Sequence, residues 1–248
     1  MRHSSRGREP GRVRLSEIFT SVEGEGVLFG TKTMFVRLAG CPLKCHWCDT
    51  TYAIPMDSGV DLSVEEVKDR ISQELVPNTY KVNFTGGEPL AQHRAVIELA
   101  RFVKEKKGVK TYLESACYDS ARFAEVLPYM DIVKVEFKLK DARAVAGGDR
   151  NYATLVKNEL ECLRMAAEAC KKPYVKVVVT NSSDLKEFTD LVRKIFAVTR
   201  DIAGFIIQPS SKVDEPVLER LFAFYDAVYP YYDQVRVVPQ LHKVIGVR

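Results

Sequence analysis

The chain has 248 residues, of which 46% are hydrophobic, and this size and composition suit one large domain with a sizeable core. Its formal net charge of +4 is too mild to require a nucleic-acid partner, so direct contact with nucleic acid is not expected. No apolar stretch approaches membrane-spanning length and no signal peptide is visible, which predicts a cytoplasmic protein without a membrane partner.

Residues 1–13 are basic and poor in apolar side chains, and we expect a flexible tail there, before a single domain at 14–248. Beyond it, apolar runs typical of strands alternate with helical patterns. The expected strands cover residues 33–38, 81–85, 109–114, 131–137, 174–180, 203–208 and 234–238. The expected helices lie near residues 62–76, 91–107, 119–127, 153–171, 184–200 and 214–229. This alternation predicts an α/β fold with a parallel sheet, and six such units fit an open, partial (β/α)6 barrel.

Three cysteines lie close together just after the first of these strands. Cys41, Cys45 and Cys48 have the spacing C-x3-C-x2-C. Three thiolates on one loop can ligate three irons of a [4Fe–4S] cluster, which leaves the fourth iron open to chelate S-adenosylmethionine (SAM). The alternative is a structural zinc site, but its fourth ligand would be His46, which lies inside the loop where ring closure is cramped. Thiolates that must stay reduced also favour the cytoplasm.

A second motif, Gly86-Gly87-Glu88-Pro89, ends the next expected strand. Together with the cysteine spacing and the aromatic Trp47 before the last cysteine, it resembles the radical SAM superfamily. The resemblance implies that Gly86, Gly87 and Glu88 meet the amino group of SAM, and it agrees with the partial barrel. Glycines allow close backbone approach and a carboxylate suits an ammonium group. Because both motifs follow strands, we expect the active site at the carboxyl ends of the strands.

Three further segments narrow the resemblance: Ser16–Gly26, Cys48–Thr50 and Pro239–Lys243. They are similar to the corresponding parts of the 7-carboxy-7-deazaguanine synthases, a family of radical SAM lyases. The resemblance implies a ring contraction of 6-carboxy-5,6,7,8-tetrahydropterin to 7-carboxy-7-deazaguanine with loss of ammonia, for queuosine or archaeosine biosynthesis. It also implies a need for Mg2+, an external electron donor and a homodimer.

The same resemblance assigns most of the site residues. For SAM these are Trp47, Gly86, Gly87, Glu88, Glu114, Lys138 and Gln208. For the pterin substrate they are Val22, Glu23, Gly24, Glu25, Arg37, Thr85 and His242, and for Mg2+ the residue is Thr50. No side chain is assigned as catalytic, because the cluster and SAM carry the chemistry.

Several of these side chains suit their roles on chemical grounds, although each also has an ordinary interpretation. The planar fork of Arg37 fits a substrate carboxylate, but equally a structural partner within the protein. Glu23 and Glu25 offer acceptors to the N–H edge of a pterin, and would otherwise be a solvated acidic turn. Thr50 offers Mg2+ a neutral oxygen, and would otherwise be a loop hydroxyl. His242 is expected either to touch substrate and order the tail, or to cap the last strand.

The chain also departs from the family pattern. Glu23 stands where glutamine is usual, Leu113–Cys117 lacks a usual glycine, and Lys138 is a loose match within Val135–Lys140. The other cysteines, Cys117, Cys162 and Cys170, have no ligand spacing and are expected to pack in the core rather than hold a second cluster.

Two other functions remain open at this point. An activating enzyme for a glycyl-radical partner would share the cysteine and glycine motifs. A zinc-binding interaction module without enzymatic activity would explain the cysteines alone.

Overall fold

The computed structural model describes residues 11–211 and 213–247. Its first strand, β1 (Arg12–Val22), pairs with β3 (Val60–Ser63) through Arg12 opposite Ser63 and Val13 opposite Leu62. The expectation of a tail at 1–13 is therefore wrong for Arg12 and Val13, because the fully buried Val13 packs in the core. Residues 1–10 of that expected tail lie outside the described residues.

One nine-stranded sheet organises the molecule, in the order β3-β1-β2-β4-β5-β6-β7-β8-β9. β2 and β4 to β9 are parallel, and β1 is antiparallel to both its neighbours. The remaining strands are β2 (Lys32–Leu38), β4 (Lys81–Gly86), β5 (Lys110–Ser115), β6 (Ile132–Phe137), β7 (Tyr174–Val179), β8 (Gly204–Pro209) and β9 (Val235–Val237). Every strand expected from the sequence is present.

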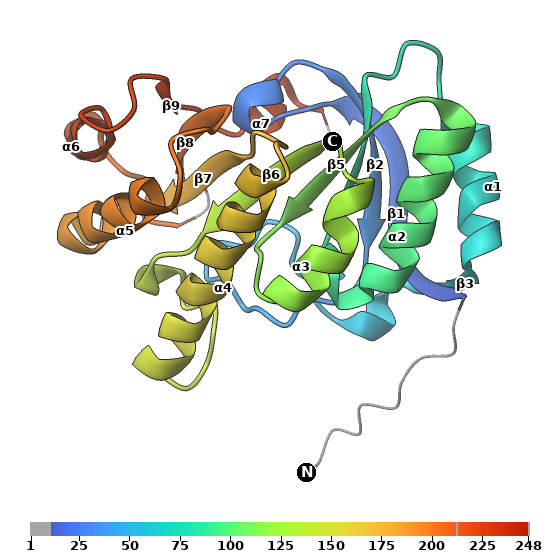
Figure 1. Ribbon diagram of the computed structural model, residues 1–248, viewed down its shortest axis with the longest axis horizontal. Coiled ribbons are helices and arrows are strands. Elements are labelled where there is room, and N and C mark those ends of the chain that lie inside the picture. Colours follow the sequence, from blue (N-terminus) through green and yellow to red (C-terminus); the bar gives the residue numbers. More distant parts are fainter. Residues whose placement is uncertain (1–10, 212, 248) are drawn as a thin grey trace.

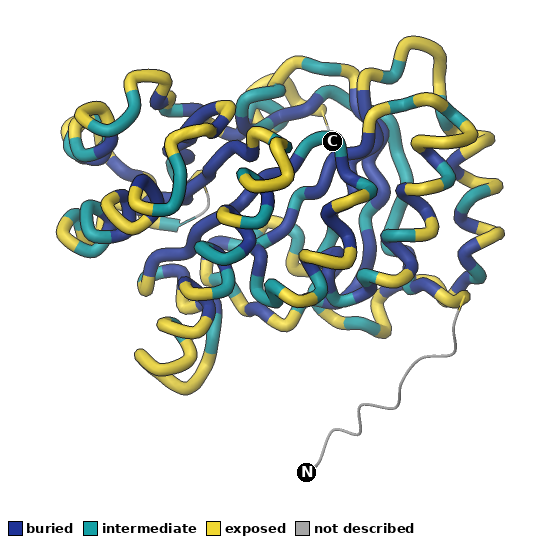
Figure 2. Tube along the Cα trace, viewed as in Figure 1, coloured by how far each residue is buried: buried dark blue, intermediate teal, exposed yellow. Residues whose placement is uncertain are grey.

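Six helices connect the parallel strands, which confirms the open, partial barrel of six strand–helix units. They are α1 (Val64–Glu74), α2 (His93–Phe102), α3 (Ser120–Val126), α4 (Asp149–Glu168), α5 (Leu185–Val198) and α6 (Leu218–Val228). Helices α1 to α5 lie along one face of the curved sheet (Figure 1). The strands are largely buried, whereas the outward turns of these helices are exposed (Figure 2). No helix in the described ranges combines the length and apolar character needed to cross a bilayer.

The sequence patterns missed β1, β3 and the short helix α7 (Leu241–Ile245). β1 mixes polar residues such as Glu17 with apolar ones such as Phe19, and both of these line a cavity instead of the core. Because polar and apolar residues share one face of β1, the alternation that marks a strand in the sequence is weak there. Short turns of other helix types complete the fold: η1 (Gly26–Leu28), η2 (Thr51–Ala53), η3 (Met56–Ser58), η4 (Pro89–Gln92), η5 (Val103–Lys107), η6 (Leu127–Tyr129) and η7 (Lys140–Ala142).

The start of α1 shows how local sequence sets an element. The Ser63 hydroxyl accepts a hydrogen bond from the backbone of Glu66, and the Glu66 carboxylate accepts one from the backbone of Ser63 at 2.6 Å. This reciprocal cap satisfies two helix-end donors that would otherwise lack partners. Val67 and Ile71 then lie one turn apart on the buried side of the helix.

Alternation along the strands separates an apolar outer face from a polar inner face. Phe84 and Leu113 point outward into the main core beneath the helices, whereas their neighbours Thr85 and Glu114 point inward and line the cavity. The lower end of the barrel is closed by a small apolar cluster of Tyr112, Tyr174, Ile206 and Val238. The polar side chains of the inner face therefore lie between two boundaries. The loops at the carboxyl ends of the strands lie on one side, and this apolar cluster lies on the other.

Candidate active site

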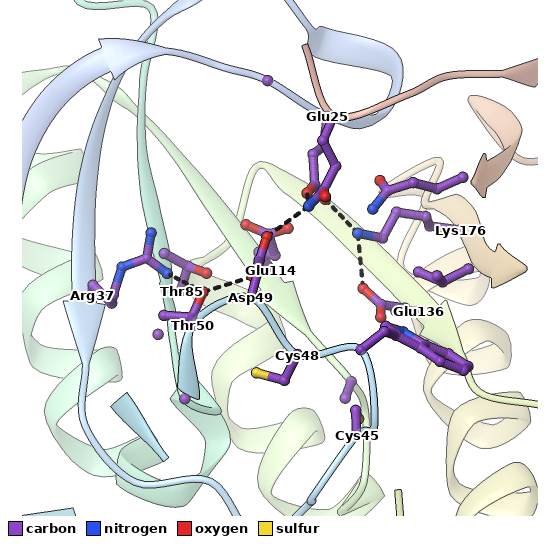
Figure 3. A pocket seen from close by; sticks show the side chains of 18 of the residues that line it. Glu25, Arg37, Cys45, Cys48, Asp49, Thr50, Thr85, Glu114, Glu136 and Lys176 are labelled. Atoms are coloured by element: carbon purple, nitrogen blue, oxygen red, sulfur yellow. Dashed lines mark hydrogen bonds and ion pairs between the residues drawn. The ribbon is translucent and has the colours of Figure 1, made fainter. Parts of the chain in front are cut away.

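One cavity of about 400 Å³ opens at the carboxyl ends of the parallel strands, and part of its lining is drawn in Figure 3. Every site residue predicted from the sequence lines it: Val22, Glu23, Gly24, Glu25, Arg37, Cys41, Cys45, Trp47, Cys48, Thr50, Thr85, Gly86, Gly87, Glu88, Glu114, Lys138, Gln208 and His242. The structure therefore brings together, from both ends of the chain, all the residues that the sequence patterns selected.

The cysteine loop follows the end of β2 and is held by backbone hydrogen bonds to two other segments. The backbone N–H of Cys41 donates to the carbonyl of Ile54 at 2.9 Å, and that of Lys44 donates to the carbonyl of Ala144 at 2.9 Å. Trp47 is buried against the same loop, whereas His46 is exposed and does not line the cavity. The side chain proposed as a fourth zinc ligand is therefore directed away from the site.

The three thiols suit a cluster better than one metal ion. Burial raises the pKa of Cys41 to about 12, and burial likewise raises the pKa values of Cys45 and Cys48, so a cation must supply the charge that makes them thiolates. A structural zinc site takes four protein ligands, whereas a cluster that binds a cofactor at its open iron needs only three thiolates. Among the described residues, no fourth cysteine lines the cavity beside these three.

The glycine segment after β4 joins the ends of three strands. Gly87 has its backbone N–H on the carbonyl of Leu38 at 2.8 Å, and a Cβ on Gly87 would lie 2.6 Å from the carbonyl oxygens of Gly40 and Ala53. Glycine is required at 87 because the backbone of the cysteine loop occupies the space of a side chain. The motif thus shapes the cluster loop as well as any ligand that binds above it.

Glu88 is almost completely buried and already has protein partners. Its carboxylate accepts hydrogen bonds from the backbone of Leu90 at 3.0 Å, the hydroxyl of Ser115 at 2.8 Å and the backbone of Ala116 at 2.8 Å. Burial raises the pKa of Glu88, and these three donors oppose that shift. Glu88 therefore ties the glycine segment to the end of β5 while lining the cavity.

Charged side chains alternate across the inner face of the sheet. Lys134 lies 2.9 Å from Glu114 and 2.6 Å from Glu136, and Lys176 lies 3.1 Å from Glu136 and 2.5 Å from Glu25. Figure 3 shows the line from Glu25 through Lys176 to Glu136. Burial alone would raise the pKa values of Glu114 and Glu136, but the lysines hold both well below their ordinary values. These carboxylates stay ionised inside the barrel.

The sequence patterns did not indicate several residues in or beside the cavity: Asp49, Lys81, Asn83, Lys134, Glu136, Lys176 and Gln240. A signal was present in β6, where Lys134, Glu136 and Lys138 alternate with apolar residues and therefore share one face of a buried strand. Charged residues at every second position of a strand in a parallel sheet predict a polar interior. Lys138 itself is paired with Glu136, and its backbone N–H donates to the buried Glu159 at 3.2 Å.

The C-terminal segment closes over the N-terminal one. The amide of Gln240 donates to Glu25 at 2.6 Å and to Asp49 at 2.7 Å, and the backbone of Leu241 donates to the carbonyl of Gly24 at 2.9 Å. Ligand atoms of Glu25, Asp49 and His242 lie within 4.8 Å of one another. Glu25 is thus fixed by distant parts of the chain, and the interpretation of this region as a solvated acidic turn is wrong.

Arg37 is held in place by a protein carboxylate. Its Nε lies 2.8 Å from Glu17, and the side chains of both residues are only 16% exposed. Its Nη1 lies 3.5 Å from the hydroxyl of Thr50, which in turn donates to Asp49 at 2.9 Å (Figure 3). Arg37 therefore forms the structural ion pair that was one of its two expected roles, and its guanidinium also lines the cavity.

One buried polar atom in the lining has no partner among the described residues. Gln208 is 4% exposed, and its side-chain oxygen accepts no hydrogen bond. A buried amide oxygen without a donor costs free energy, about 1–3 kcal/mol, so a ligand with an N–H or O–H group fits beside it. This agrees with the assignment of Gln208 to cofactor binding.

Comparisons with known proteins agree with this site. Residues 22–155 match the family model for a 4Fe-4S single cluster domain. The chain is 32% identical to the 7-carboxy-7-deazaguanine synthase of Methanocaldococcus jannaschii over 94% of this chain and 99% of that protein. It is 30% identical to the enzyme of the same name from Archaeoglobus fulgidus, over 96% and 100% of the two chains.

Solved structures show the same fold at lower identity. QueE from Escherichia coli superposes with a TM-score of 0.61 at 19% identity, covering 93% of this chain and 95% of that one. A domain of a pyruvate-formate lyase-activating enzyme from Bacteroides vulgatus has a TM-score of 0.52 at 16% identity, covering 63% and 98%. With near full-length relatives at 30% and 32% identity, the alternatives of a glycyl-radical activase and of a zinc module are set aside. This chain belongs to the 7-carboxy-7-deazaguanine synthase family of radical SAM enzymes.

Proposed function

We propose that this chain converts 6-carboxy-5,6,7,8-tetrahydropterin to 7-carboxy-7-deazaguanine, with loss of ammonia. The observation that carries the proposal is one cavity with the cysteine loop at its rim and Glu23, Glu25 and Arg37 in its wall. The names of the near full-length relatives support the same reaction.

Cys41, Cys45 and Cys48 would hold the [4Fe–4S] cluster, and the glycine segment with Gln208 would hold SAM. When bound, this pair of cofactors would supply radical chemistry that removes a hydrogen atom from the pterin, given one electron from an external donor. The residues of the cavity would hold and orient the reactants. Trp47, Glu114 and Lys138 complete the lining on the cofactor side.

The substrate side offers acceptors and one fixed cation. Glu23 and Glu25 suit the N–H groups of the pterin ring, and the free edge of Arg37 suits the substrate carboxylate. Val22, Gly24, Thr85 and His242 line the same wall. The pairing of Arg37 with Glu17 supports this role, because it fixes the guanidinium through Nε and leaves Nη2, with Nη1 beside the hydroxyl of Thr50, for a ligand in the cavity.

We also propose that Mg2+ binds between Thr50, Asp49 and the substrate carboxylate. The side-chain oxygens of Thr50 and Asp49 are adjacent, and Mg2+ commonly combines one or two protein oxygens with oxygens of the substrate. A single domain that includes β1 from Arg12 onward, a cytoplasmic location and a homodimer belong to the same proposal. They rest on the family resemblance and on the need to keep the thiols reduced.

Anaerobic turnover with SAM, a reductant, Mg2+ and 6-carboxytetrahydropterin tests the proposal, with the product identified by mass spectrometry. We expect a deazapurine and ammonia, both lost in Cys45→Ala together with the bound iron. Cys117 and Cys162 are buried as expected, but Cys170 is exposed, so the expectation that it packs in the core is wrong. Cys170→Ala is therefore the matched control and should retain both products. Cluster-replete enzyme that cleaves SAM but forms no deazapurine would overturn the proposed substrate.

A further inference from the structure

Lys81 is a fully buried lysine that lies behind the substrate wall of the cavity. It begins β4, and its ammonium group donates to Glu23 at 2.8 Å and to the hydroxyl of Thr33 at 2.5 Å. A weaker contact reaches the hydroxyl of Thr31 at 3.3 Å, and the Tyr112 ring centre is 5.2 Å away. Lysine is almost never fully buried unless its charge is met. Among the described residues, Glu23 is the one carboxylate paired with it.

Glu23 uses only one of its two oxygens on the protein. Its Oε2 accepts from Lys81, and Asn83 lies 3.5 Å from that same oxygen. Its Oε1 has no hydrogen-bond partner in the described part of the chain, and Glu23 is 4% exposed while lining the cavity. Oε1 is therefore the atom that a ligand in the cavity can reach.

The other ionisable groups around Glu23 make its negative charge costly. Those that face it are Lys81 from β4, Glu114 from β5, Glu25 from its own segment, and the hydroxyls of Tyr112 and Tyr174 from β5 and β7. Burial raises the pKa of Glu23, Glu114 and Glu25 raise it as well, and Lys81 lowers it, and together these effects give a pKa of about 7. Without Lys81, a buried carboxyl beside two carboxylates would take up a proton.

We propose that Lys81 is a positioning residue of the substrate site, which favours the carboxylate form of Glu23 and directs its Oε1 at the N–H edge of the pterin. This inference rests on the proposed function and names a specificity device within it. A protonated Glu23 would keep one acceptor oxygen, but it would lose the negative charge that strengthens a hydrogen bond from the N–H edge, and its O–H group could not pair with an N–H group. The Glu23–Lys81 ion pair has no net charge and offers the substrate one acceptor oxygen, as the side-chain amide of a glutamine would. We therefore expect that Glu23→Gln removes the need for Lys81.

The test compares Lys81→Met, Glu23→Gln and the double variant, with Lys110→Met as the control. Lys110 is the register partner of Lys81 on β5 but is exposed, so its loss should leave KM unchanged. Lys81→Met should raise KM for the pterin on the order of ten- to a hundred-fold at neutral pH, the value of one charge-assisted hydrogen bond. This KM should improve as pH rises, because Glu23 then ionises without its lysine. The double variant should recover most of the loss and show no such pH dependence.

A second readout does not need turnover. Infrared difference spectra of the holoenzyme report the protonated carboxyl of Glu23, identified by its disappearance in Glu23→Gln. Its titration midpoint should move to higher pH in Lys81→Met, or in Lys81→Gln if the methionine variant does not fold. A merely structural role for Lys81 would reduce folded protein without moving this midpoint or the pH dependence of KM.

The outcomes separate the two proposals. If the unchanged enzyme makes no deazapurine, the proposed function fails and this substrate role fails with it. If the unchanged enzyme turns over the pterin, but Lys81→Met has the same KM profile and the same infrared midpoint, only the role of Lys81 is overturned. A double variant no better than Lys81→Met alone would also overturn it.

Discussion

Glu88 accepts a hydrogen bond from the backbone N–H of Ala116 at 2.8 Å, and this bond fastens the glycine segment after β4 to the end of β5. The two residues lie 28 positions apart in the chain. The carboxylate that the sequence motif suggests for SAM is therefore also a structural link between two adjacent strands, and the two roles can be separated by experiment.

Glu88→Gln should destabilise the fold, because its amide group would face one of the buried donors from Leu90, Ser115 and Ala116. We expect a loss of about 1–3 kcal/mol in the free energy of unfolding, the cost of one unsatisfied buried hydrogen-bonding group. Anaerobic chemical unfolding measures it. Glu125→Gln on the exposed side of α3 is the control and should change stability by less than about 0.5 kcal/mol. Equal stability of Glu88→Gln and the unchanged protein would contradict the structural role.

Gly87→Ala should lower the iron content as well as SAM binding. Its new Cβ would lie 2.6 Å from the carbonyl oxygens of Gly40 and Ala53, so the start of the cysteine loop must move. Iron and sulfide per chain after anaerobic reconstitution provide the measurement. Gly108→Ala controls for a general glycine effect, since its Cβ would meet nothing within 4 Å despite a φ of +63°. If Gly87→Ala has a full complement of iron but binds SAM weakly, the new Cβ clashes with SAM and not with the cysteine loop, and this prediction is contradicted.

Arg37→Lys should weaken substrate binding, because lysine keeps the charge but cannot contact Glu17 and a carboxylate with one rigid fork. KM for the pterin should rise roughly ten-fold, since a charge-assisted hydrogen bond contributes about 1.5–3 kcal/mol. Steady-state kinetics at saturating SAM measure this change. The exposed Arg94→Lys on α2 should leave KM unaltered. An unchanged KM in Arg37→Lys would show that Arg37 does not bind the substrate and only forms the ion pair with Glu17.

Thr50→Val keeps the shape of the side chain but removes the oxygen offered to Mg2+. Turnover should fall sharply and lose its dependence on Mg2+, while SAM cleavage without substrate persists. A Mg2+ titration of product formation is the measurement. Thr51→Val is a close control, because Thr51 is exposed and does not line the cavity. Identical Mg2+ titrations for Thr50→Val and the unchanged enzyme would exclude this oxygen as a ligand.

Glu23→Gln should make stability less dependent on pH. Burial raises the pKa of Glu23 from 4.5 to about 7 in the folded protein, so between these values the folded state holds the proton more tightly than the unfolded chain. This group's contribution to stability is full below pH 4.5 and declines as pH rises to about 7, by at most about 1.4 kcal/mol per pH unit. Chemical unfolding at both ends of this window, relative to Glu98→Gln on the exposed face of α2, measures it. Parallel pH profiles for Glu23→Gln and the unchanged protein would contradict the raised pKa.

The sequence by itself determined the features that are written in short stretches of chain. The cysteine loop, the glycine segment and the order of parallel strands and helices all depend on neighbours within a few residues. The structure has the elements in the predicted order, and both segments line the cavity. The capping box at Ser63 belongs to the same class. The edge strand β3 and its neighbour β1 are weakly patterned, and they were missed because their pairing is set by the rest of the sheet.

Only the tertiary structure decided which charges meet inside the barrel. Lys81 and Glu23 are 58 residues apart, Lys176 and Glu25 are 151 apart, and Gln240 and Glu25 are 215 apart. Whether such groups are ionised depends on burial and on partners a few ångströms away, which local sequence patterns do not specify. The residue types in the site could therefore be predicted from the chain, whereas the arrangement that fixes their charge required the fold.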